Sequence, residues 1–80
     1  MKNDNKKYYK KFGENLQNLI EKQGKDVMTI ASVGNIEQKQ VYRVLNGEHG
    51  ANLKTIIAIA KGLDIHPKEL FDFQFDLDKE

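Results

Sequence analysis

The sequence predicts an all-α domain built from five short helices. Apolar residues recur at three- and four-residue spacing through most of residues 8–71, which is the spacing of one helix face. Glycine, asparagine or aspartate interrupts this pattern repeatedly, and these residues commonly end helices. The chain has 80 residues, enough for one domain with a modest core.

The first helix is expected to begin near Tyr8 or Tyr9 and to end before Gly24. Gly24 is a suitable stop because glycine readily adopts the left-handed backbone that ends helices. The stripe expected to face the core comprises Phe12, Leu16, Leu19, Ile20 and Gln23. Residues 1–7 before it are polar and lysine-rich, and we expect them to form a flexible basic arm.

The next two helices are expected to be joined by a tight turn at Gly34-Asn35, and the side chain of Ile36 is expected to anchor this turn to the core. Asp26 is a good cap for the second helix, because its carboxylate can accept a bond from a free amide in the first turn. The third helix is expected over about residues 37–46, with Glu37 as a substitute for the usual cap. Its inward stripe is Val41, Val44 and Leu45.

The fourth helix is expected to start after Asn52, which is a favourable capping residue. Its wide apolar face predicts the most buried element, and this face comprises Leu53, Ile56, Ile57, Ile59, Ala60 and Leu63. Pro67 favours the first turn of a fifth helix, which Leu70 and Phe71 would anchor.

The acidic and aromatic tail, residues 72–80, changes period. Aromatic and aliphatic residues alternate with polar ones from Phe71 to Asp78, which is strand periodicity. A lone strand has no partner on a helical domain, so we expect it to pair with its copy in a second subunit. The dimer interface would then contain Phe73, Phe75 and Leu77. A helical or disordered tail with only Phe71 docked is the alternative.

Composition excludes several classes of function. The chain has no cysteine, so disulfides and cysteine-based zinc sites are excluded. The two histidines have no partners that would suggest a catalytic or metal site, so we expect no enzyme activity, metal or other cofactor. No apolar run is long enough to cross a membrane, no signal peptide is visible and no small-molecule site is evident, so a cytoplasmic protein is expected.

Charge is distributed unevenly along the chain. Residues 1–43 carry nine basic and five acidic side chains, a net charge of +4, whereas residues 44–80 carry four and seven, a net charge of −3. A basic front half suits a protein that approaches a polyanion in one orientation. On the third helix, Gln38, Lys39, Tyr42 and Arg43 share the face opposite the apolar stripe. Arginine and glutamine can bond base edges in the DNA major groove, although an ordinary solvated face has the same composition.

Three segments together carry a family resemblance: FGENLQNLIEKQG, IASVGNIEQKQVYRVLNG and NLKTIIAIAKGLDIHPKELF. In their order and spacing they resemble the Cro/C1 repressor-like (XRE-type) helix-turn-helix domains, over residues 12–71. The resemblance implies a lambda-repressor-like fold for residues 8–71 and a transcriptional regulator that is a repressor. It also implies a homodimer that binds a pseudo-palindromic operator in double-stranded DNA.

The resemblance also implies site residues. The third helix would read the major groove through Gln38, Lys39 and Arg43, with Gln40 and Tyr42 reaching bases or nearby phosphates. Phosphate contacts would come from the start of the second helix near Val27 and from the backbone around Gly47 and Asn52.

Departures from the family pattern leave a second function open. Where relatives have an Arg–Glu ion pair, this chain has Ile20 and Leu45, which we expect to pack directly. Glu48 and His49 stand in a loop that is often basic in relatives. The alternative is a helix-turn-helix protein-interaction module or antitoxin that uses the C-terminal tail.

Overall fold

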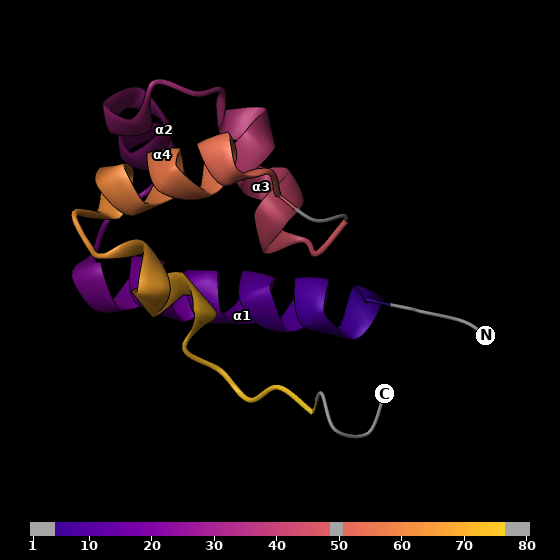
Figure 1. Cartoon of the computed structure of the whole chain (residues 1–80). Coiled ribbons are helices and arrows are strands. Elements are labelled where there is room, and N and C mark those ends of the chain that lie inside the picture. Colours follow the sequence, from indigo (N-terminus) through magenta and orange to yellow (C-terminus); the bar gives the residue numbers. More distant parts are fainter. Residues whose placement is uncertain (1–4, 49–50, 77–80) are drawn as a thin grey trace.

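The computed structural model describes residues 5–48 and 51–76, and within them the chain is helical with short connections (Figure 1). The elements are α1 (Lys6–Gln23), α2 (Val27–Gly34), α3 (Gln38–Leu45), α4 (Leu53–Leu63) and the 3-10 helix η1 (Pro67–Phe71). In Figure 1, α1 lies along the lower side of the molecule, and α2, α3 and α4 pack together above it. The predicted all-α class is confirmed, with a 3-10 helix in place of the fifth α-helix.

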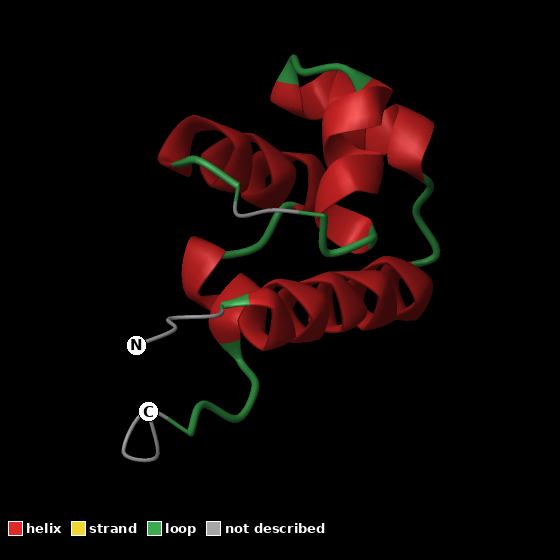
Figure 2. Cartoon of the chain, turned by 90° about the vertical axis from the view of Figure 1, so that its right-hand side faces the viewer, coloured by secondary structure: helices red, strands yellow, loops and turns green. Residues whose placement is uncertain are grey.

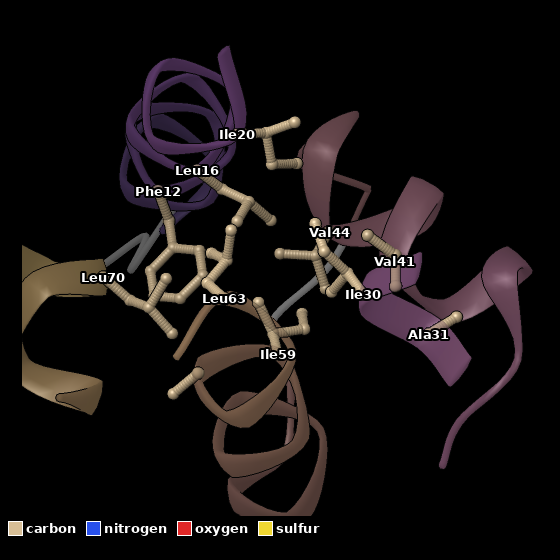
Figure 3. Close-up of a cluster of buried hydrophobic side chains, with 11 residues drawn as sticks. Phe12, Leu16, Ile20, Ile30, Ala31, Val41, Val44, Ile59, Leu63 and Leu70 are labelled. Carbon is tan, nitrogen blue, oxygen red and sulfur yellow. The ribbon is translucent and has the colours of Figure 1, made fainter. Parts of the chain in front are cut away.

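One hydrophobic core joins all five elements, and Figure 3 shows its side chains converging between α1, α4 and the α2–α3 pair. Leu16, Ile59 and Leu63 are completely buried near its centre, and Leu70 of η1 is buried at one side. The rest of the core comprises Phe12, Ile20, Ile30, Ala31, Val41, Val44 and Ala60. The core therefore fixes α3 on one face only and leaves its opposite face exposed.

Glycines allow the closest helix crossings. A Cβ atom at Gly62 of α4 would lie 2.5 Å from the carbonyl oxygen of Ile30 in α2. A Cβ at Gly34 of α2 would collide with the carbonyl oxygen of Ala58 in α4. The two helices therefore cross with their backbones in contact, which no other residue type would permit without displacement.

All four described α-helices end with the same hydrogen-bond pattern around a residue of left-handed conformation. After α2 this residue is Asn35, whose amide donates to the carbonyl of Ser32 at 3.2 Å. The amide of Ile36 donates to the carbonyl of Ala31 at 3.0 Å, and Ile36 packs against the core. This is the Schellman motif, and it explains how asparagine replaces the usual glycine in the turn. The residues equivalent to Asn35 in α1, α3 and α4 are Gly24, Gly47 and Asp64.

The end of α1 gives a direct test of this motif. Gly24 has φ +65°, and no heavy atom would lie within 4 Å of a Cβ added there. We expect Gly24→Ala to lower the free energy of unfolding by about 1 kcal/mol through backbone strain alone. Gly24→Asn should cost less, because asparagine tolerates this conformation. Urea denaturation measures both, and equal losses would contradict the account.

Three sequence-based expectations need correction. α1 begins at Lys6, so two residues of the expected arm are helical, while residues 1–4 lie outside the described part of the chain. At the other end of α1, Gln23 is exposed and does not face the core. The apolar face of α4 is narrower than predicted, since Leu53 is 69% and Ile57 39% exposed. The reason is that neighbouring elements cover α4 on one side only.

The predicted strand is absent from residues 72–76, which run beneath α1 as an irregular segment (Figures 1 and 2). Phe75 stacks on Tyr8 of α1 with ring centroids 5.1 Å apart, and Phe73 meets Phe12 edge-on at 6.3 Å. Lys11 donates to the carbonyl of Gln74 at 3.1 Å. The aromatic side chains thus pack on the chain's own first helix, a surface that strand periodicity cannot reveal. Leu77 lies outside the described residues.

Candidate nucleic-acid interface

The α2–α3 pair holds the candidate interface. α2 is short, and Asp26 caps it by accepting a 2.8 Å hydrogen bond from the amide of Thr29, as predicted. The left-handed turn at Asn35 then redirects the chain into α3. Within α3, Val41 is fully buried and Val44 is 6% exposed, which fixes the rotation of the helix about its axis. Side chains on the other face consequently point away from the core.

Five polar or aromatic side chains cover that outer face of α3. All of the predicted base-reading residues are exposed: Gln38, Lys39, Gln40, Tyr42 and Arg43. Within the described ranges, none of the five side chains makes a hydrogen bond or an ion pair. Tyr42 is 50% exposed despite its large ring. The face therefore carries unused donors, acceptors and two positive charges, which is what binding to base edges and phosphates requires.

The start of α2 offers backbone donors of its own. The amides of Val27 and Met28 have no intrahelical acceptor because they lie in the first turn of α2. The Asp26 carboxylate does not bind them, since it accepts the amide of Thr29. The side chain of Val27 packs against the core, so only its backbone N–H is available to an anion. Its neighbour Met28, in contrast, is 63% exposed and does not pack against the core. The helix dipole adds to the attraction for a phosphate at this end.

Asp26 makes the stability of α2 dependent on pH. The hydrogen bond from the Thr29 amide holds the pKa of the Asp26 carboxyl below its ordinary value of 3.8. A carboxyl whose pKa is depressed on folding stabilises the fold above its unfolded pKa and loses this effect as pH falls through the folded pKa. We expect the stability difference between the wild type and Asp26→Asn to shrink below about pH 4. Thermal unfolding of both proteins between pH 2 and 6 tests this, and a constant difference would contradict it.

The start of α4 carries another of the predicted phosphate contacts. Asn52 caps α4 through a 2.8 Å hydrogen bond from the amide of Thr55. Asn52 lines an open polar hollow between the starts of α3 and α4, together with Gln40 and Lys54. The sequence interpretation missed Lys54, although its place in the first turn after the cap could have indicated a phosphate contact.

Gly47 differs from the other candidate phosphate contacts. Its amide donates to the carbonyl of Val44 at 3.0 Å, and a Cβ there would lie 3.0 Å from the Cα of Lys10. The structure therefore gives Gly47 a role in the turn and in packing against α1, and a phosphate contact by the backbone around it stays a prediction.

Glu37 also departs from expectation. It occupies the N-cap position of α3 but makes no side-chain capping hydrogen bond, in contrast to Asp26 and Asn52. Its side chain is one methylene longer than that of aspartate, and glutamate is not among the favoured caps. The carboxylate is exposed at the end of α3 that bears Gln38.

No group of three or more metal-ligating side chains is found among the described residues. None of the helices formed by residues 5–48 and 51–76 is long and apolar enough to cross a membrane.

Comparison with known proteins decides the family. A family model of the Cro/C1-type HTH DNA-binding domain matches residues 15–76. The chain belongs to this Cro/C1-type family. Among solved structures, the chain is similar to the restriction-modification controller protein C.AhdI from Aeromonas hydrophila. The two are 33% identical with a TM-score of 0.73, and the match covers 79% of this chain and 96% of that one. A search of curated proteins gave no match.

As a Cro/C1-type protein, the chain is a DNA-binding transcription regulator. Its α2–α3 pair is the helix-turn-helix. Its apolar departures from the family pattern lie in or against the hydrophobic core. Ile20 is buried in the core and Leu45 packs against that core, where relatives place an ion pair. Their direct contact stays a prediction. Replacing a buried ion pair by apolar residues of similar size often leaves the stability of the fold unchanged or raises it, which is consistent with an intact fold.

Proposed function

We propose that the chain is a sequence-specific repressor that places α3 in the major groove of double-stranded DNA. The supporting observation is the exposed face of α3, where five side chains lack partners among the described residues while the core fixes the helix behind them. In this proposal Gln38, Lys39 and Arg43 read base edges, and Gln40 and Tyr42 reach bases or adjacent phosphates. Free backbone amides at the start of α2, at Val27, and at the start of α4, after Asn52, hold phosphates.

Nuclear magnetic resonance can locate this surface without knowledge of the operator. Titration with a duplex should shift the backbone amides of α3 and of the first turns of α2 and α4. Amides of the tail and of the outer side of α1 should be nearly unchanged in a monomeric complex at low protein concentration. Shifts confined to the tail and α1 would contradict the proposal and favour the alternative, a protein-interaction module or antitoxin.

Two chains are expected to bind one operator. A dimer would present two copies of α3 to successive major grooves about 34 Å apart on a pseudo-palindromic site. We assign the dimer interface to the tail, through Phe73, Phe75 and Leu77. Support comes from Phe73 and Phe75, which α1 covers only in part, and from Phe71 of η1, which is 44% exposed although its ring contacts Phe12. These aromatic side chains also line a partly open, mainly apolar pocket of about 160 Å³, which leaves apolar surface for a second chain to cover.

Truncation after Asp72 tests the interface while keeping η1 complete. We expect the truncated chain to be monomeric in sedimentation equilibrium at concentrations where the full chain is a dimer. It should also bind an operator at least tenfold more weakly, because the two half-sites would no longer be bound together. A truncated dimer with unchanged DNA affinity would place the interface elsewhere.

Control of a restriction-modification system is the narrower form of this proposal. It is supported by the similarity to C.AhdI, which extends over 96% of that controller. An operator selected by this chain should then lie upstream of restriction or methyltransferase genes in its source genome. A location beside unrelated genes would leave the regulator proposal intact and remove the narrower one.

A further inference from the structure

Glu37 places an unpaired carboxylate at the start of α3, where a negative charge without a binding role would weaken attraction to DNA. Glu37 is exposed at the N-cap of α3, and its side chain has no hydrogen-bond or ion-pair partner in the described parts of the chain. Its backbone carbonyl still accepts the amide of Gln40 at 3.0 Å, so the start of α3 is formed without help from the side chain. The carboxylate is therefore available to an external partner.

The negative charge of Glu37 restricts which DNA groups its carboxylate can bind. The N-terminal residues of a recognition helix lie nearest to base edges, so Glu37 would enter the groove directly before Gln38. A carboxylate repels phosphates, and it accepts hydrogen bonds but donates none. Among the groups exposed in the major groove, amino hydrogens are suitable donors, and the cytosine N4 amino group is the usual partner of glutamate.

We infer that Glu37 is a specificity-determining residue that selects cytosine at one position of each half-site. This inference rests on the proposed placement of α3 in the major groove. Guanine and thymine present only acceptors or a methyl group there, so their contact with Glu37 would leave the carboxylate desolvated and unpaired. Adenine offers an N6 amino group but places the N7 acceptor beside it. Selection would thus come as much from rejection of the wrong bases as from the bond to cytosine.

The test compares duplex selections by the wild type, Glu37→Ala and Glu37→Gln, followed by binding titrations on the winning sites. We expect the wild type to enrich cytosine at one position per half-site and to bind sites with another base there about tenfold more weakly. Glu37→Ala should lose this preference while keeping those at the other positions. Glu37→Gln should shift the preference toward adenine, which glutamine can bond in two places.

Glu48→Gln is the matched control, because it makes the same charge change just beyond the opposite end of α3. It should raise affinity for all duplexes similarly and leave the cytosine preference intact. Thermal unfolding of each variant shows whether α3 is still formed. An unchanged cytosine preference in folded Glu37→Ala, or an equal gain of affinity on every sequence, would overturn the inference. Failure of the wild type to enrich any sequence would instead overturn the proposed function.

Discussion

Replacing Leu16 by alanine is expected to lower the free energy of unfolding by about 2–5 kcal/mol. Leu16 is completely buried at the centre of the core, where α1 meets the other helices. The loss combines the transfer energy of the removed atoms with the cavity that they leave. Because small domains have a total stability of about 5–15 kcal/mol, this change threatens the fold itself.

Leu53→Ala is the control for this prediction, since it makes the same chemical change at a leucine that is 69% exposed. It should alter stability by no more than about 0.5 kcal/mol. Urea denaturation of the two variants measures the difference directly. Similar losses would show that the assigned core does not carry the stability of the domain.

Replacing Arg43 by alanine should weaken binding to the preferred operator by roughly 1–3 kcal/mol. Arg43 is exposed on α3 and makes no intramolecular ion pair within the described residues, so its removal leaves the fold unchanged. Its guanidinium can bond O6 and N7 of one guanine with two parallel hydrogen bonds. Binding to unrelated duplexes should fall less, and the preference at one base pair should relax.

Lys22→Ala is the matched control for the charge of Arg43, because Lys22 is an exposed cation in the last turn of α1. Its removal should change affinity little at moderate salt. Fluorescence anisotropy with operator and scrambled duplexes measures all three proteins. An equal loss on both duplexes for Arg43→Ala would identify Arg43 as a phosphate contact.

The sequence predicted the helices well because their ends depend on local chemistry. Gly24 and Asn35 end helices through their own left-handed conformations, and Asp26 and Asn52 start them through their own side chains. These effects act over three or four residues, so a pattern along the chain is enough to find them. The spacing of Val41 and Val44 likewise fixed the inward face of α3 and hence the exposed candidate site.

Features that depend on distant parts of the chain were harder to predict. The alternation of Phe73 and Phe75 indicates a strand only if a second strand is available, and in this chain the rings pack on Tyr8 and Phe12 instead. The exposure of Leu53 depends on how far the neighbouring helices extend around α4. Glu37 stands at the cap position in sequence as a substitute for the favoured residues, but whether its longer side chain reaches a free amide is decided by geometry.

Methylation interference on a bound operator tests the central claim most directly, because dimethyl sulfate modifies guanine N7 in the major groove and adenine N3 in the minor groove. If α3 reads the major groove, N7 methylation should block binding at guanines in two clusters about one helical turn apart. In Arg43→Ala, one guanine per cluster should lose this effect while the others keep it. Interference only at adenine N3, or a pattern unchanged in Arg43→Ala, would contradict the account.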